Sequence, residues 1–65
     1  MKRDFLITVR RPNGKELEPV LRLTEKGAND YADRMLKKYE KGTIVEVGYF
    51  TKNLIWTVYR RDIVE

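Results

Sequence analysis

Apolar and polar residues alternate along the first part of the chain, in a pattern with a period of two. Such alternation predicts a half-buried β-strand over residues 4–10. A second strand is expected over residues 16–23, and Pro19 within it has no N–H to donate to a ladder, which places this strand at an edge of the sheet. The residues on the apolar face of the first strand are Phe5, Ile7 and Val9.

The link between these strands, Arg11-Pro12-Asn13-Gly14, has the composition of a tight turn. Two pairings of the strands follow from it. A two-residue Asn-Gly loop sets apolar residues opposite charged ones on one face. A type I turn closed by a glycine bulge instead pairs apolar residues with one another, Val9 with Leu17 and Phe5 with Leu21. We therefore predict the bulged turn.

In the middle of the chain, apolar positions recur every three or four residues, which predicts an amphipathic helix. Thr24 is a favourable N-cap, and Gly42 supplies a C-terminal stop. The helix is expected over about residues 25–41, with lysines near its end complementing the helix dipole. Its apolar stripe comprises Ala28, Tyr31, Ala32, Met35, Leu36 and Tyr39.

A second hairpin is expected over residues 43–51 and 54–62, with its turn at Lys52-Asn53. Pairing across a two-residue turn sets Tyr49 opposite Trp56 and gives a face that packs under the helix. The helix-facing side of this hairpin is thus predicted to be aromatic and β-branched, as a buried sheet face should be.

The predicted fold class is α+β, in the order ββαββ, as one domain over residues 1–65. A four-stranded, mainly antiparallel sheet carries the single helix on one face. The expected core comprises Phe5, Ile7, Val9, Leu17, Leu21, Tyr31, Met35, Leu36, Val47, Trp56 and Val58.

The composition argues against catalysis. The chain contains no Cys, His or Ser, which removes the commonest nucleophiles and the commonest general base. No set of carboxylates is spaced to gather around a cation. We therefore expect a non-enzymatic protein without a cofactor or metal. Since it also lacks disulfides and any apolar run of about 18 residues, its expected location is the cytoplasm, with no membrane partner.

The charge balance points to acidic partners, because 14 Lys and Arg against 10 Asp and Glu give a net charge of +4. Each predicted element crosses the sheet once, so basic residues from several segments converge at one end. Such a cluster can hold phosphates, although the same residues also suit a helix dipole or simple solvation. The converging residues are Arg10, Arg11, Lys15, Lys37, Lys38, Lys41, Arg60 and Arg61.

The sheet face away from the helix is expected to be unusually apolar. Aromatic residues on an open sheet can stack on single-stranded bases, but Glu16, Glu18 and Glu46 on this face repel a phosphate backbone. We therefore expect a protein contact here, in the form of a symmetric homodimer. Its residues are Phe50, Ile55 and Tyr59, extended by Leu6, Val20 and Ile44.

Two functional hypotheses follow from the sequence. In the first, a small nucleic-acid-associated or regulatory binding protein acts through its basic end, as a dimer joined by the outer sheet face. In the second, the chain is an interaction module, such as an inhibitor or adaptor encoded by a phage or mobile element, whose basic surface docks on an acidic protein. Co-elution with nucleic acid at low salt separates the two.

Overall fold

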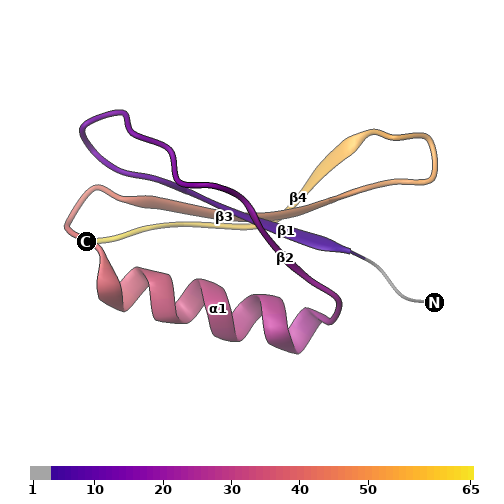
Figure 1. The fold of residues 1–65 in the computed structure, drawn as a ribbon, viewed down its shortest axis with the longest axis horizontal. Helices are drawn as coiled ribbons and strands as arrows, with labels where there is room; N and C mark the ends of the chain where they lie inside the picture. Colours follow the sequence, from indigo (N-terminus) through magenta and orange to yellow (C-terminus); the bar gives the residue numbers. More distant parts are fainter. Residues whose placement is uncertain (1–3) are drawn as a thin grey trace.

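The computed structural model describes residues 4–65. Its strands form one antiparallel sheet in the order β2-β1-β3-β4, and the helix packs on one face against β1, β3 and β2 (Figure 1). The predicted α+β class and ββαββ order are therefore confirmed. The elements are β1 (Phe5–Arg10), β2 (Val20–Arg22), α1 (Glu25–Lys38), β3 (Ile44–Phe50) and β4 (Trp56–Ile63).

The core lies between α1 and the central strands, because the inward side chains of β1 and β3 meet the apolar stripe of the helix. The buried apolar residues are Phe5, Ile7, Val9, Ala28, Ala32, Met35, Val45 and Val47. Leu17, Tyr31, Leu36, Tyr39 and Tyr49 pack around them, partly buried. Three residues expected in the core are not there, since Leu21 and Val58 are about half exposed and Trp56 lies on the opposite face of the sheet.

The first turn is the predicted bulged turn. The Arg11 N–H donates to the Lys15 carbonyl at 2.8 Å, and the Gly14 N–H donates to the Arg11 carbonyl at 2.9 Å. Gly14 has a φ of +85°, the left-handed conformation that glycine adopts without a steric penalty. Next to the turn, Arg10 faces Glu16 as expected.

The predicted register of this hairpin is wrong beyond Pro19. There the ladder shifts by one residue, so that Ile7 faces Val20 and Leu6 faces Leu21. Pro19 cannot donate a ladder hydrogen bond, which interrupts the strand and lets the extra residue be absorbed. As a result Val20 belongs to the helix face, and Leu21 lies on the face away from α1, hereafter the open face. The edge position predicted for this strand is confirmed.

The second turn differs from the expected two-residue loop. The Thr51 N–H donates to the Ile55 carbonyl at 2.9 Å, and the Leu54 N–H donates to the Thr51 carbonyl at 2.8 Å. This is the same bulged turn as the first, with Leu54 at a φ of +61° in the position that Gly14 occupies there. The Thr51 hydroxyl also accepts from the Ile55 N–H at 3.1 Å, which helps to close the turn.

The longer turn moves β4 by one residue, so Phe50 pairs with Trp56 and Gly48 with Val58. Because side chains alternate along a strand, this shift places Trp56 and Val58 on the open face rather than under the helix. A bulge between Val47 and Gly48 shifts the register again, so Arg60 pairs with Val47 and lies on the helix face, as expected from the sequence. The predicted burial of Trp56 fails for this reason.

The helix begins as predicted and ends earlier. Thr24 caps it, its hydroxyl accepting from the Gly27 N–H at 3.0 Å. The helix ends at Lys38, because Tyr39 is extended with a φ of −105°, and three residues expected to be helical instead lead into β3. Gly42, with a φ of +94°, serves the turn into β3, and its N–H donates to the Val64 carbonyl at 2.8 Å. No helix within residues 4–65 has the length and apolarity needed to cross a membrane.

Candidate functional site

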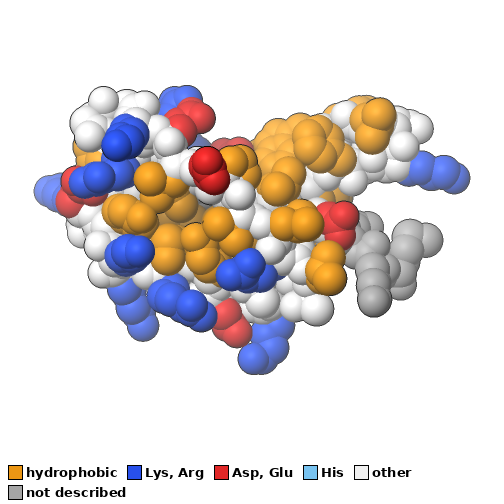
Figure 2. Space-filling view, viewed as in Figure 1, with side chains coloured by type: hydrophobic (Ala, Val, Ile, Leu, Met, Phe, Trp, Pro, Cys, Tyr) orange, Lys and Arg blue, Asp and Glu red, His pale blue; other side chains and the backbone are white. Residues whose placement is uncertain are grey.

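The predicted convergence of basic segments is present in the fold. The β1–β2 turn, the end of α1, the start of β3 and the end of β4 lie at one end of the molecule, on the left of Figure 1. In Figure 2, Lys and Arg side chains gather around the same end and along the helix. All eight predicted basic residues belong to these segments, but they fall into two classes according to their partners.

Arg11 belongs to the class that is held by a carboxylate. Its Nε lies 3.1 Å from Glu40 Oε1 and its Nη2 lies 2.9 Å from Glu40 Oε2, a bidentate pair. The hydrogen bond from Arg11 lowers the pKa of Glu40 to about 2, and the same contact raises the pKa of Arg11. This pair ties the first turn to the loop after α1, so Arg11 serves the fold.

Arg60 is bound on the helix side of the sheet. Its guanidinium donates to Asn29 Oδ1 at 3.1 Å and to Asp33 and Asp62, both at 2.5 Å. The hydrogen bond to Asp33 is the main cause that raises the pKa of Arg60. Arg60 thus bridges β4 and α1, and it binds Asp33, the carboxylate that lies four residues before Lys37 on the helix.

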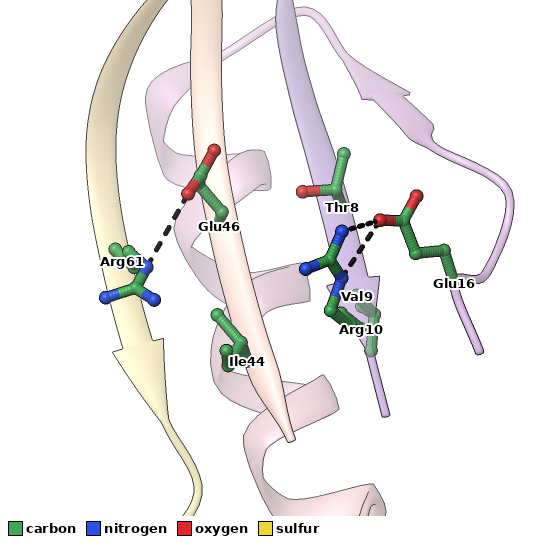
Figure 3. Close-up of a pocket in the computed structure, with 7 residues that line it drawn as sticks. All are labelled: Thr8, Val9, Arg10, Glu16, Ile44, Glu46 and Arg61. Atoms are coloured by element: carbon green, nitrogen blue, oxygen red, sulfur yellow. Dashed lines mark hydrogen bonds and ion pairs between the residues drawn. The ribbon is translucent and has the colours of Figure 1, made fainter. Parts of the chain in front are cut away.

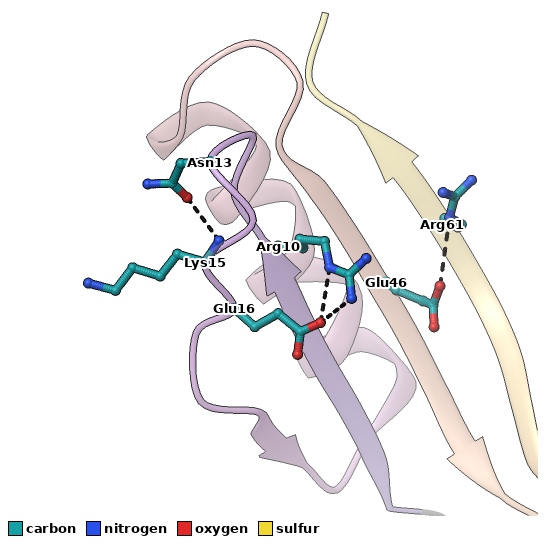
Figure 4. A network of polar contacts seen from close by, with 6 residues as sticks. All are labelled: Arg10, Asn13, Lys15, Glu16, Glu46 and Arg61. Carbon is teal, nitrogen blue, oxygen red and sulfur yellow. Dashed lines mark hydrogen bonds and ion pairs between the residues drawn. The ribbon is translucent and has the colours of Figure 1, made fainter.

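Two further arginines lie on the open face, around a hollow of about 270 Å³ (Figure 3). Arg10 Nε donates to Glu16 Oε1 at 3.0 Å, and Arg61 Nε lies 3.7 Å from Glu46 Oε2. Figure 4 shows both pairs side by side, with Lys15 pointing away from them. Because two glutamates compensate two arginines, this hollow does not present a net positive charge to an anion.

The second class is free of carboxylates. Lys26 Nζ lies 3.4 Å from Asp30 Oδ2, and Arg60 pairs with Asp33. Spacing along the helix would favour pairs of Asp30 with Arg34 and of Asp33 with Lys37, but neither pair forms. Lys38 lies over the ring of Tyr39, at 5.5 Å from its centroid. At this end of the molecule, five exposed cations have no carboxylate partner among residues 4–65, and together they are here named the cationic end: Lys15, Arg34, Lys37, Lys38 and Lys41. Lys52 is also exposed and unpaired with a carboxylate, but it lies on the β3–β4 turn at the opposite end.

Arg34 is the one member of the cationic end that is absent from the eight residues predicted from the sequence, and Asp30, four positions before it, binds Lys26 instead. The signal was present in the spacing. Arg34, Lys37 and Lys38 stand three and four positions apart, so they share one exposed face of α1. Because Asp30 is paired with Lys26 and Asp33 with Arg60, neither aspartate neutralises these three cations, and the face is basic.

The open face differs from its prediction in membership. Tyr59 is on the helix side, where its ring meets Phe5 at 5.6 Å between centroids and its hydroxyl donates to Glu25. Val20 also faces the helix. Ile55 lies opposite Thr51, next to the Phe50–Trp56 pair, so it is on the other side of the hairpin and not on the open face as expected. Leu6 and Ile44 are on the open face as expected. Exposed apolar residues concentrate on the β3–β4 hairpin, the orange lobe at the upper right of Figure 2. We name the hairpin patch by its residues, Phe50, Leu54, Trp56 and Val58.

The hairpin patch is pre-arranged around an aromatic pair. The rings of Phe50 and Trp56 lie 5.1 Å apart at 60°, and the indole covers Gly48, where a Cβ atom would lie 2.6 Å from Trp56 Cη2. Beside them Leu54 is 80% exposed in a left-handed conformation that costs a branched residue about 1–2 kcal/mol. Because Leu54 is so exposed, burial among residues 4–65 offsets little of that cost.

No family model, no curated protein and no solved structure matches this chain. The function must therefore be argued from the chemistry of its own surfaces. Within residues 4–65, no group of carboxylates gathers closely enough to hold a metal ion. The cationic end offers five separate positive charges to a ligand, and the hairpin patch offers apolar surface to a macromolecule.

Proposed function

We propose that this chain is a small, non-enzymatic nucleic-acid-binding protein that holds the phosphate backbone with its cationic end. One observation carries the proposal: Lys15, Arg34, Lys37, Lys38 and Lys41 have no carboxylate partner among residues 4–65, while the neighbouring arginines are all paired. Uncompensated cations at one end of a protein with net charge +4 suit a ligand with repeated negative charges.

The two classes of cation have separate tasks in this proposal. The paired arginines fix the segments, since Arg11 joins the first turn to the loop after α1 and Arg60 joins β4 to α1. The lysines are flexible point charges on exposed backbone, which suits contact with phosphate oxygens rather than recognition of base edges. Binding is therefore expected to depend on salt and to depend little on nucleotide sequence.

Fluorescence anisotropy with a labelled DNA duplex tests the proposal. If about four phosphates are neutralised, the logarithm of affinity falls with the logarithm of salt concentration with a slope of roughly −4. The combined change Lys37→Glu and Lys38→Glu should weaken binding more than about tenfold at low salt and flatten the slope. Both side chains are exposed, so the melting temperature should stay close to that of the parent.

The matched control reverses two charges away from the cationic end, with Lys26→Glu and Lys52→Glu. This pair changes the net charge by the same amount, and it should reduce affinity far less than the change at Lys37 and Lys38. Equal losses from the two pairs would mean that net charge alone attracts the nucleic acid. Absence of binding at about 50 mM salt, together with capture of an acidic protein that survives nuclease treatment, would favour the acidic-protein hypothesis instead.

A further inference from the structure

We infer that the hairpin patch is the contact of a symmetric homodimer, in which the patch of one copy packs on the same patch of a second copy, with Leu54 as the anchor residue. The inference is independent of the cationic end, because the patch occupies the β3–β4 hairpin, which Figure 1 shows at the other end of the molecule.

The conformation of Leu54 is the first observation. The chain builds the same bulged turn twice, and the left-handed position holds Gly14 in one turn and Leu54 in the other. Glycine adopts this conformation freely, whereas leucine is strained in it. Leu54 is also 80% exposed, so burial within its own chain does not offset the strain. Backbone strain that no packing within the chain offsets is typical of residues that bind another molecule.

The surface of the single chain is the second observation. It exposes 4964 Å², whereas a compact monomer of 7.8 kDa exposes about 4400 Å². The excess over the whole chain is on the order of 600 Å². Its radius of gyration is 11.7 Å, above the roughly 10.7 Å of a compact chain of this length. Both values describe a less compact shape than that of an average chain of this length, and the protruding β3–β4 hairpin contributes to it (Figure 1).

The distribution of charge selects a second copy as that partner. Lys52 is the one charged residue between positions 50 and 58, so two patches can meet with little repulsion. A two-fold axis through the patch places the two cationic ends at opposite ends of the dimer, where their mutual repulsion is weakest. Phe50 and Trp56 supply the rigid aromatic surface that dominates the energy of such contacts.

Sedimentation equilibrium over protein concentrations from about 1 to 200 µM tests the inference, because a dimer shows a concentration-dependent mass. The parent should dimerise in this range. Leu54→Gly should raise the dimer dissociation constant at least tenfold and, at the lowest concentration, raise the melting temperature of the monomer. This opposite effect on association and on folding distinguishes an anchor residue from one that merely supports the fold.

Phe50→Glu should give a monomer, and Leu23→Ser, which changes a similarly exposed residue outside the patch, should leave the dissociation constant within about twofold of the parent. If Phe50→Glu does not fold, Leu54→Gly alone decides. A parent that is monomeric at the highest concentration overturns the inference. If that monomer sediments with anionic lipid vesicles, the patch binds a membrane surface and not a second copy. A dimer whose dissociation constant is unchanged by Leu54→Gly overturns it too.

Discussion

Replacing Gly48 by Ala tests the unexpected placement of Trp56 on the open face. In the structure a Cβ atom at position 48 would touch the indole, at 2.6 Å from Trp56 Cη2, and would lie 2.8 Å from the carbonyl oxygen of Thr57. The indole can rotate away at a cost in packing, but the carbonyl belongs to the paired strand and cannot. Gly48→Ala must therefore distort the β3–β4 ladder.

The magnitude follows from two opposing effects. Overpacking costs about 1–3 kcal/mol, and alanine recovers about 0.5–1 kcal/mol because it restricts the unfolded chain more than glycine does. Because the Thr57 carbonyl cannot move away, the overpacking cost falls in the upper part of its range, about 2–3 kcal/mol. The net loss is then about 1–2.5 kcal/mol, which lowers the melting temperature of a domain of this size by roughly 4–20 °C. Circular dichroism measures the melting temperature, and tryptophan emission reports whether the indole has become more exposed.

A double variant separates the indole from other causes. With Trp56→Leu in the background, Gly48→Ala should cost about half as much, because only the clash with the Thr57 carbonyl remains. An unchanged or higher melting temperature for Gly48→Ala alone would refute the position of the indole over Gly48. It would favour the register expected from the sequence, with Trp56 under the helix.

Three further predictions concern the first turn and the ion pairs. Gly14→Val should lower the free energy of unfolding by more than about 1 kcal/mol in urea titrations, whereas Gly14→Asn should cost less, since asparagine tolerates a positive φ. Because Arg11 lowers the pKa of Glu40 from 4.5 to about 2, the pair stabilises the fold above that range and the contribution is lost as pH falls toward 2. Melting temperatures between pH 6 and pH 2 should consequently fall less steeply for Glu40→Gln than for the parent. Arg60→Ala should cost about 1–2 kcal/mol by leaving its carboxylates unpaired, while Arg61→Ala, at a more exposed pair, should cost less than about 0.5 kcal/mol.

Local signals were sufficient for the element order and for one turn. Pro12 and Gly14 specify a bulged turn because each favours one backbone conformation, and Thr24 marks the start of the helix because its hydroxyl can cap it. The second turn carries no such signal, since leucine rarely adopts the left-handed conformation that Leu54 has. An error of one residue there moved Trp56 to the wrong face, because strand side chains alternate with a period of two.

The candidate site was predictable in position and not in composition. Topology alone brings the basic segments to one end, and that placement does not depend on register. Which cations remain free depends on tertiary contacts, because Asp33 lies four residues before Lys37 in sequence but binds Arg60 from β4. Sequence spacing alone cannot tell whether Asp33 will bind Lys37 on its own helix or Arg60, which is 27 residues away in the chain.

The salt dependence of DNA binding by the parent and by the Lys37→Glu, Lys38→Glu variant tests the central claim most directly. The account predicts a linear log-log plot with a slope of roughly −4 for the parent, and a slope reduced by about two when those lysines are reversed. A parent affinity that does not change with salt, or an unchanged slope in the variant, would contradict the assignment of phosphate binding to the cationic end.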